Sequence, residues 1–416
     1  MSRIFNYFAI ALGVVFLGGC RQVAPTSGLS HVRPAEVGLD EARLELIDST
    51  VQASIEAEDI PGAVVAVMRN DKIAFLRAYG NKQVVPDTIP MTTETLFDMA
   101  SVSKCVGTTL SFMQLIEQGK VLLTDKVKQY IPEFEPWEDP DMGEKVDITV
   151  QDLLTHASGL DAYISVPKFV KRFGRYQADS LVRYIATEVG RNFRPGTDYK
   201  YSCLNFVTLQ AILERVTGER LCDYAQKHVF DVLGLEHTTY FPIKGAPSNP
   251  RAEELKPLCA PTTVQKDGKP FWGVVHDPIA RAINGGNSGN AGVFSCAEDL
   301  CVIASAILNG GSYRGRRILA PETVRLMMSI PPANDPKIGR ALGWDTYGMN
   351  PVTSGDIFTS PHTIGHTGYT GTSIVMEPRT RTAVIILSNR VHPKDDGSAA
   401  RLRATVGNIV AGAIRD

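Results

Sequence analysis

The sequence lacks the features that mark several large classes of protein. No basic run and no alternation of basic with aromatic residues appears, and 43 Lys and Arg against 45 Asp and Glu leave a net charge of −2. A surface that binds a nucleic acid backbone needs clustered positive charge, so nucleic acid is not expected as a partner. Internal repeats and low-complexity tracts are also absent. The 416 residues, 44% of them hydrophobic, suffice for a soluble globular protein with two packed lobes.

Cysteine and histidine patterns give no metal or redox motif. The seven cysteines form no Cys-x-x-Cys pair, so neither a zinc ribbon nor a thioredoxin-type motif is predicted. Their spacing does not determine any disulfide pairing. His362 and His366 make a His-x-x-x-His sequence, but no glutamate follows His362, and Gly365 argues against the helix that a zincin needs. We therefore expect no metal and no cofactor.

Long hydrophobic runs are scarce, and the N-terminal one is short. The apolar stretch from Ile4 to Phe16 is too short for a comfortable transmembrane helix, and it follows the basic Arg3 as in a signal peptide. The sequence "LGGC" that ends at Cys20 resembles a bacterial lipobox, in which cleavage leaves the cysteine as the lipidated first residue. An ordinary secretory signal with an incidental cysteine is the alternative, and both interpretations predict export.

Three segments follow from these signals. Residues 1–20 are expected to form a lipoprotein-type signal peptide, residues 21–36, rich in Pro, Ser, Thr and Gly, a tether, and residues 37–416 the folded domain. Near the start of the domain, apolar residues at helical spacing predict an amphipathic helix over 40–57, capped by Asp40.

Two strand pairs lie at opposite ends of the domain. "AVVAVMR" and "KIAFLRAYG" flank a turn at Asn70-Asp71, and "GTSIVMEP" and "TAVIILSN" flank a turn over 378–381, before a helix predicted over 399–414. Four segments between them carry a helical apolar stripe: "SFMQLIEQGK", "VQDLLTHASG", "FVTLQAILERVTG" and "AEDLCVIASAILNGG". We predict an α/β (α+β) fold in which an antiparallel sheet, built from both chain ends and flanked by terminal helices, is interrupted by an inserted, mainly helical lobe, with a cleft between them.

The stretch "LFDMASVSKCVG" places Ser101 three residues before Lys104. If Ser101 opens a helix, the lysine lies beside its hydroxyl, and the amides at the helix start can stabilise an oxyanion. The apolar neighbours of Lys104 are expected to desolvate it and to lower its pKa toward that of a usable base. A capping serine with a solvated lysine is the alternative, and the same spacing at Ser165 and Lys168, in a sequence typical of a loop, shows that spacing alone decides nothing. A Gly-x-Ser-x-Gly elbow is absent, because "GNSGN" ends in asparagine.

The residues around Ser101 resemble a known family. "LFDMASVSK", "GKVLLTDKVKQYIPEF", "ITVQDLLTHASGL", "RPGTDYKYSCLNFVTLQAILERVTG", "GNAGVFSCAEDL", "RALGWDT" and "GHTGYTGTSIVMEPRT" follow in the order found in β-lactamase-related serine hydrolases: class C β-lactamases, D,D-peptidases, D-aminopeptidases and related esterases. The resemblance runs from about Val37 to the C-terminus, and so many ordered blocks are more specific than one tetrapeptide. It implies a β-lactamase/transpeptidase-like fold with Ser101 and Lys104 as catalytic residues.

The second motif of this family is Tyr-x-Asn, whose tyrosine relays protons. Here Tyr201 takes the first place and Cys203 stands where the asparagine would be. The resemblance implies that Tyr201 acts as base and acid, with a phenol pKa lowered by the lysine charge, whereas a packed aromatic is the alternative. Cysteine is a poor substitute for an amide, which Asn205 could supply if the loop is shifted. "SGN", ending at Asn290, fits the Ser-x-Asn motif of other penicillin-recognising enzymes and is a rival for the same role.

The third motif of the family is Lys-Thr-Gly on an inner strand, which reads His366-Thr367-Gly368 here. An unperturbed imidazole is mostly neutral at pH 7, so attraction of a substrate carboxylate is expected to weaken unless His366 is held protonated. Gly368 is expected to let the substrate backbone approach the strand. The resemblance implies that the amides of Tyr369 and Ser101 form the oxyanion hole.

These features predict an exported, lipid-anchored serine acyl hydrolase that works through an acyl-enzyme. The resemblance implies β-lactams, D-Ala-D-Ala peptides, D-amino acid peptides or esters as substrates; a position in the cell envelope favours peptidoglycan peptides, and His366 disfavours efficient β-lactam hydrolysis. The alternative is a penicillin- or muropeptide-binding module that is acylated without turnover, which Cys203 keeps open. A purely structural lipoprotein is a third interpretation. We expect a monomer on the periplasmic side of a membrane, the outer one if present, whose partners are that membrane and a small-molecule or cell-wall peptide substrate.

Overall fold

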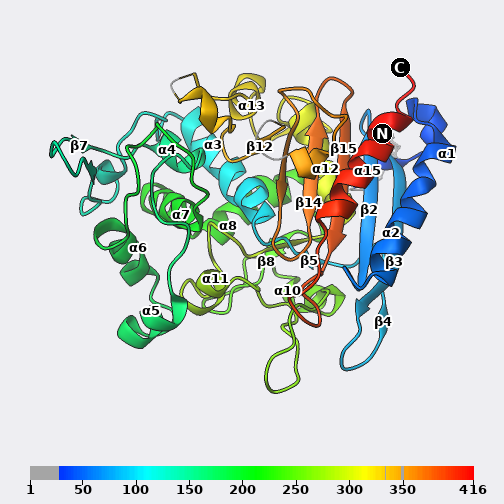
Figure 1. Ribbon diagram of the computed structural model, residues 1–416, viewed down its shortest axis with the longest axis horizontal. Helices are drawn as coiled ribbons and strands as arrows, with labels where there is room; N and C mark the ends of the chain where they lie inside the picture. The colour runs from blue at the N-terminus through cyan, green and yellow to red at the C-terminus, as the bar shows by residue number, and fades with distance from the viewer. Residues whose placement is uncertain (1–27, 333, 348–350) are drawn as a thin grey trace, which may run out of the picture.

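One large sheet organises the molecule. In the computed structural model, which describes residues 28–332, 334–347 and 351–416, the sheet has eight strands in the order β1-β3-β2-β15-β14-β13-β12, with β4 paired to β3. The strands come from both chain ends: β1 (Ser30–His31), β2 (Gly62–Arg69), β3 (Lys72–Gln83), β4 (Ile89–Pro90), β12 (Asp345–Thr346), β13 (Ile364–Thr367), β14 (Ser373–Glu377) and β15 (Thr382–Ser388). Figure 1 shows the blue and orange strands side by side, with the helical lobe beyond them. The predicted sheet and inserted lobe are therefore confirmed.

β2 and β15 join the two ends of the chain within the sheet. They run antiparallel, with Ala63 opposite Ser388 and Arg69 opposite Thr382, and both strands are buried along their whole length. Successive side chains of β2 pack alternately against the helical lobe and the terminal helices, as the two-residue period of a strand requires. Asn70 and Asp71 both have left-handed φ (51° and 60°), the conformation of a tight two-residue hairpin.

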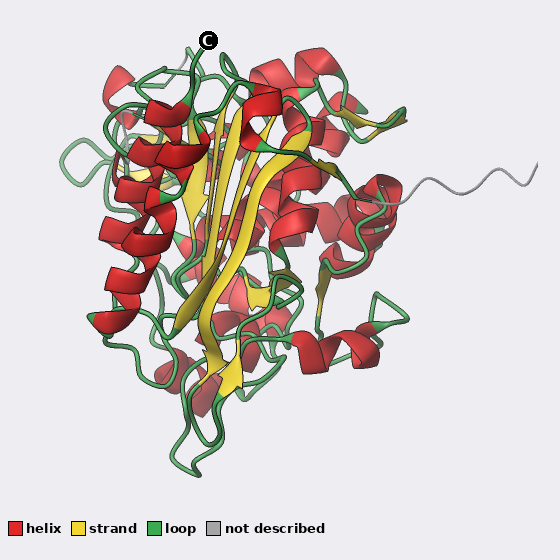
Figure 2. Ribbon diagram, turned by 90° about the vertical axis from the view of Figure 1, so that its right-hand side faces the viewer, coloured by secondary structure: helices red, strands yellow, loops and turns green. Residues whose placement is uncertain are grey.

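Helices from both chain ends cover one face of the sheet. α1 (Glu41–Leu44), α2 (Leu46–Glu56) and α15 (Ala400–Ala413) pack there, and Figure 2 shows helices on both sides of the strands. The Asp40 side chain caps α1 as predicted, by accepting a hydrogen bond from the backbone of Arg43. The single helix predicted over 40–57 is divided at Glu45, whose φ of −60° and ψ of −22° correspond to a 3₁₀ turn.

The helical lobe fills the chain between the strand pairs. All four predicted segments are helical, as α3 (Leu110–Glu117), α4 (Val150–Leu154), α7 (Cys203–Thr217) and α12 (Ala297–Leu308). The other helices of the lobe are α5 (Val166–Phe173), α6 (Ala178–Thr187), α8 (Leu221–Ala225), α9 (Asp231–Leu233), α10 (Ala252–Leu255), α11 (Pro278–Ala282) and α13 (Pro321–Met327), whereas α14 (Pro351–Ser354) packs against α15 and the main sheet. A small sheet of β5 (Phe97–Asp98), β9 (Val293–Ser295) and β8 (Thr239–Tyr240) lies beside them, with two-stranded pairs β6 (Trp137–Glu138) with β7 (Lys145–Val146) and β10 (Ser312–Tyr313) with β11 (Arg316–Arg317).

The folded body begins before the predicted boundary at residue 37. Leu29 is buried, β1 pairs with β3, and the Val32 amide donates to the Ile73 carbonyl. The tether predicted over 21–36 is therefore too long at its C-terminal end, because apolar residues within it reach the core. The predicted signal peptide, with Cys20, lies outside the described residues. No helix in the described ranges combines the length and apolarity needed to cross a bilayer.

Candidate active site

A sharp turn presents Ser101 at the start of a helix. β5 ends at Asp98, whose carboxylate accepts a hydrogen bond from the Ala100 amide (2.9 Å), and Ala100 has a φ of 45°. A positive φ is strained for alanine, and such strain is commonly kept at functional sites. The Lys104 amide then donates to the Ser101 carbonyl (3.0 Å), and a π-helical stretch, Lys104–Thr109, continues into α3. Ser101 therefore opens a helix, as its motif requires.

Lys104 is fully buried and reaches the serine. Its Nζ donates to the Ser101 Oγ at 3.0 Å and to the Asn290 carbonyl at 2.8 Å, and lies 3.6 Å from the Cys203 Sγ. The second Ser-x-x-Lys sequence has neither feature. Ser165 directly precedes α5, so its segment is not the predicted loop, and both Ser165 and Lys168 are exposed.

Tyr201 lies beside Lys104 and Ser101. Its ring centroid lies 5.1 Å from the Lys104 Nζ, and Lys104 and Ser101 are both near enough to act on the pKa of its phenol. The segment before α7 is fixed by two bonds of Ser202, from its amide to the His156 Nδ1 (3.2 Å) and from its Oγ to the Asp161 carbonyl (2.6 Å). His156 also packs against the Tyr201 ring, with centroids 4.4 Å apart.

The three residues considered for the place of the missing asparagine lie in different surroundings. Cys203, the first residue of α7, faces Lys104. Asn205 is buried, and its amide is occupied by the Ser158 Oγ (2.6 Å) and the His156 Nδ1 (3.0 Å), so the expectation that it replaces the missing asparagine is wrong. Asn290 does lie in the site, where its carbonyl binds Lys104 and its side chain neighbours Cys203.

Two pKa expectations from the sequence have the wrong sign. Burial lowers the pKa of Lys104, but attraction to negative charge at Cys203 and Tyr201 outweighs it, and the pKa is raised overall. Burial raises the pKa of the Tyr201 phenol, and the Lys104 charge offsets this only in part. Burial likewise raises the pKa of Cys203. The site therefore holds the ammonium form of Lys104 with the protonated Tyr201 phenol and Cys203 thiol, and the expected lowering of the Lys104 pKa toward that of a usable base is wrong.

The loop after β13 lies against the serine turn. Thr370 Oγ1 donates to the Asp98 carbonyl (2.7 Å) and Thr372 Oγ1 to the Met99 carbonyl (3.0 Å). Within the described part of the chain, the amides of Ser101 and Tyr369 donate to no protein acceptor, as the resemblance predicts for an oxyanion hole.

Glycine is required at position 368 by the chain itself. A Cβ there would lie 2.1 Å from the Thr372 Oγ1 and 2.5 Å from the Met99 carbonyl oxygen. The expected reason, space for a substrate backbone, is thus not the one that the packing gives. Gly368 instead allows the two loops to touch.

A cleft of about 440 Å³ opens at Ser101, between sheet and helical lobe. It is lined by Ser101, Tyr199, Tyr201, Asp345, His366, Thr367, Gly368, Tyr369, Arg390 and Arg403. No motif marked the two arginines, which follow the last block that resembles the family. Tyr369 is 57% exposed and carries the Arg390 guanidinium 4.7 Å above its ring.

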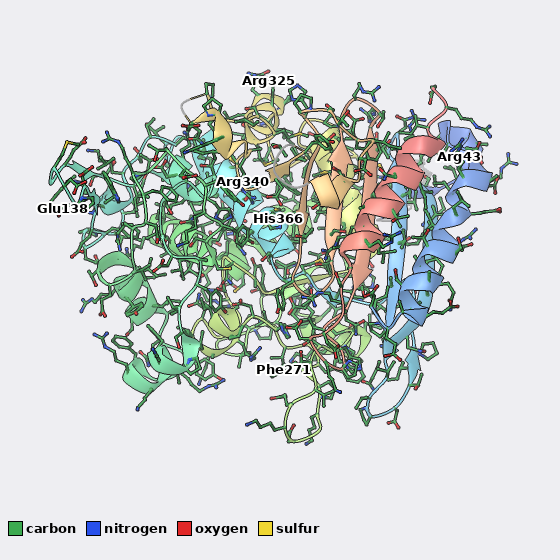
Figure 3. All side chains as sticks on the ribbon, in the orientation of Figure 1. Arg43, Glu138, Phe271, Arg325, Arg340 and His366 are labelled. Carbon is green, nitrogen blue, oxygen red and sulfur yellow. The ribbon has the colours of Figure 1, made fainter. Side chains whose placement is uncertain are left out.

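His366 is buried (2% exposed) and neutral. Burial, and then the charges of Arg340 and Lys104, hold its pKa well below the ordinary value. Its Nδ1 contacts the Thr367 carbonyl at 2.8 Å. Figure 3 shows Arg340 and His366 near each other in the middle of the molecule, and Arg340 is fully buried in an ion pair with Asp345. His366 therefore cannot replace a lysine as a cation for substrate.

The hydrogen bond from the buried Lys104 to Ser101, with Tyr201 beside both, agrees with the family that the sequence blocks resemble, the serine hydrolases that include β-lactamases and penicillin-binding proteins. The family model "Beta-lactamase" matches residues 47–408, and the chain belongs to that family. A Salmonella agona protein named "Putative D-alanyl-D-alanine carboxypeptidase" is 31% identical over 379 residues, 88% of this chain and 86% of that one.

Solved structures agree on the fold. EstCE1, described as a hydrolase with promiscuous acyltransferase activity, superposes with a TM-score of 0.68 at 24% identity, covering 89% of this chain and 99% of that one. The octameric penicillin-binding protein homologue from Pyrococcus abyssi gives a TM-score of 0.64 at 18% identity, covering 87% of this chain and 75% of that one. The protein is thus a serine hydrolase of the β-lactamase and penicillin-binding protein class.

The raised pKa values predict an alkaline rise of activity. If Ser101 passes its proton to the pair of Lys104 and Tyr201, that pair must first have released a proton of its own. Because the pKa values of both groups are raised, this release occurs at alkaline pH. We expect kcat/KM for a neutral ester to increase with pH through and above neutrality, following a single proton. Steady-state assays from about pH 5 to about pH 10 measure this. An acid limb that ends well below neutrality would contradict it.

Proposed function

We propose that the protein is an exported serine acyl hydrolase that cleaves D-amino acid peptides, of the D-alanyl-D-alanine kind, through an acyl-enzyme on Ser101. The observation that carries the proposal is the hydrogen bond of the buried Lys104 to Ser101 beside Tyr201. The name of the Salmonella agona relative supports the substrate class.

Protons move through Lys104 and Tyr201 in this mechanism. The pair takes the proton of Ser101 as its Oγ attacks the substrate carbonyl carbon, and the amides of Ser101 and Tyr369 hold the oxyanion. The pair then gives the proton to the departing amine, which leaves the acyl group on Ser101. Water then attacks the ester carbonyl carbon while the same pair takes its proton. The pair returns this proton to the Ser101 Oγ as the bond to the acyl group breaks and the carboxylic acid leaves.

The substrate carboxylate needs a cation other than His366. Arg390 and Arg403 line the cleft, and burial and the nearby Arg390 lower the pKa of Arg403 to about 10, so it stays charged at neutral pH. The Arg390 guanidinium lies over Tyr369 and pairs with Asp395 at 2.9 Å, and the Arg403 Nη2 donates to the Gly368 and Thr372 carbonyls. These bonds hold the two cations at the cleft, where their remaining donors suit a carboxylate-ended peptide. We propose that they take the part that lysine plays in Lys-Thr-Gly.

The location follows from the N-terminal sequence. We propose that Cys20 carries the lipid and that residues from about Arg21 to Gly28 link it to the body, which places the monomer on the periplasmic face of a membrane.

A binding module that is acylated but not hydrolysed is the second candidate. Cys203 favours it, because the thiol next to Lys104 gives neither the donor nor the acceptor geometry of an asparagine amide. Slow deacylation is the expected sign of that role.

Product analysis with two peptides tests the substrate class. The protein should release D-alanine from a peptide that ends in D-Ala-D-Ala, and about tenfold or more slowly from its C-terminal amide, which cannot pair with the arginines. Intact-mass analysis with a penicillin runs in parallel. A persistent adduct without any D-alanine release would favour the binding module, and equal rates for acid and amide would remove the role of Arg390 and Arg403.

A further inference from the structure

The backbone of residue 290 is part of the lysine site. The Asn290 carbonyl accepts the shorter of the two hydrogen bonds to oxygen that Lys104 makes, 2.8 Å against 3.0 Å to Ser101. A carbonyl oxygen at this distance directs the ammonium and stabilises its charge. The position of Lys104 therefore depends on what holds Asn290.

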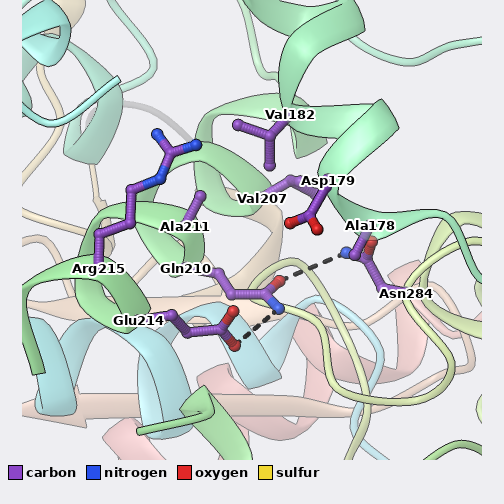
Figure 4. A pocket seen from close by; sticks show the side chains of 9 residues that line it. All are labelled: Ala178, Asp179, Val182, Val207, Gln210, Ala211, Glu214, Arg215 and Asn284. Carbon is purple, nitrogen blue, oxygen red and sulfur yellow. Dashed lines mark hydrogen bonds between the residues drawn. The ribbon is translucent and has the colours of Figure 1, made fainter. Parts of the chain in front are cut away.

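Gln210 holds the residue next to it. This α7 side chain is 4% exposed, and its Oε1 accepts from the Gly289 amide (2.9 Å) and from the Asn284 Nδ2 (3.3 Å). Its Nε2 donates to the Asn287 carbonyl (2.9 Å) and to Glu214 (3.1 Å). Figure 4 shows Gln210 between Glu214 and Asn284, in a pocket of about 190 Å³ that is lined by neither Ser101 nor Lys104. Three of the four hydrogen bonds of the glutamine therefore hold this loop, and the fourth goes to Glu214 on its own helix.

A second chain of bonds runs through Ser288. The Asn284 Nδ2 donates to the Ser288 Oγ (2.8 Å), which donates to the Asn290 Oδ1 (2.7 Å). Gly289 packs directly against the backbone of α7, since a Cβ there would lie 2.0 Å from the Phe206 carbonyl oxygen. The Thr108 Oγ1, from the helix that carries Lys104, donates to the Gly289 carbonyl (2.7 Å).

We propose that Gln210, supported by Ser288, is a positioning residue for the hydrolase reaction: it holds the Asn290 carbonyl that aims the Lys104 ammonium at Ser101. This inference rests on the proposed role of Lys104. Gln210 touches neither Ser101 nor the cleft. It acts through the backbone between Gly289 and Asn290.

Displacing the Asn290 carbonyl removes a group that stabilises the positive charge of Lys104. The titratable groups whose charges act on Lys104 are Tyr201, Cys203, Asp277, Cys105, His156 and His366. All remain when Gln210 is replaced, so only the support of the ammonium by the carbonyl weakens. Because a less stabilised ammonium has a lower pKa, the acid limb of the kcat/KM profile should move to lower pH. The value of kcat should fall because the Lys104 Nζ is no longer held toward the Ser101 Oγ.

Gln210→Met in the full protein tests this, with Gln114→Met as the matched control. Gln114 is also buried (9% exposed), and its amide donates to two carbonyls, those of His228 and Ile318, at 3.0 Å each. Both variants should lose melting temperature to a similar degree. Only Gln210→Met should lower kcat, by about tenfold or more, and shift the acid limb, with KM for an activated ester little changed.

A second pair of variants, each of which removes a single hydroxyl, tests the inference if Gln210→Met does not fold. Ser288→Ala removes one hydroxyl with two side-chain partners, and Ser305→Ala removes another, bonded to Asp71 and Asn309. A shifted pH limb in Ser288→Ala alone supports the inference. Profiles that match the wild type in Ser288→Ala and in folded Gln210→Met would overturn it, while wild-type kinetics in a folded Lys104→Met would overturn the proposed function instead.

Discussion

Ser101→Ala should abolish turnover of esters and peptides and all covalent labelling by penicillin. The variant loses the Oγ that Lys104 contacts beside Tyr201, and the hydroxyl of the nearby Ser103 is engaged by the Val293 amide (3.0 Å). We expect kcat to fall on the order of 10⁴-fold or more. Stopped assays with an activated ester, together with intact mass after incubation with penicillin, measure both effects.

The chain provides its own control for this variant. Ser165 stands in a second Ser-x-x-Lys sequence but lies exposed before α5. Ser165→Ala should keep full activity and labelling. Residual turnover in Ser101→Ala at more than a small fraction of the wild-type rate would end the assignment of Ser101 as nucleophile.

Lys104→Met should remove about 10³-fold of kcat/KM while the protein stays folded. Methionine fills the space of the buried side chain without a charge that needs partners, so the melting temperature should hold. The loss falls on catalysis because Tyr201 no longer has a cation to stabilise its anionic form. The alkaline rise of activity should also change shape, since one of its two titrating groups is gone.

Lys168→Met is the matched variant, because Lys168 is exposed. It should leave both rate and pH profile unchanged. If Lys104→Met unfolds, circular dichroism and the melting curve reveal it. A folded Lys104→Met with wild-type kinetics would refute a role for the lysine in proton transfer.

The fold could be predicted from local patterns. Apolar runs on either side of turn residues marked β2, β3, β14 and β15, because strands buried on both faces, such as β2 and β15, are rich in β-branched side chains. The helical stripes marked α7 and α12. The break at Glu45 and the entry of Leu29 into the core could not be predicted, since both depend on contacts with distant parts of the chain.

The candidate site was predictable in its residues but not in its charges. Motif order pointed to Ser101, Lys104 and Tyr201, which the fold brings together. The sign of the Lys104 pKa shift depends on how near Cys203 and Tyr201 come, and spacing in the sequence does not give such distances. For the same reason nothing in the sequence marked Gln210, which looks like an ordinary polar residue of a helix.

The pairing of β2 with β15 determines when the enzyme can first act. Pairing strands from opposite ends of the chain is slow, because a long loop must close before any contact forms. During synthesis, β2 and β3 can pair early, but the loop that carries Thr370 and Thr372 leaves the ribosome near the end. Only then are the turn at Met99 and the serine after it locked in place. A nascent or C-terminally truncated chain would therefore carry the serine, lysine and tyrosine without being a hydrolase.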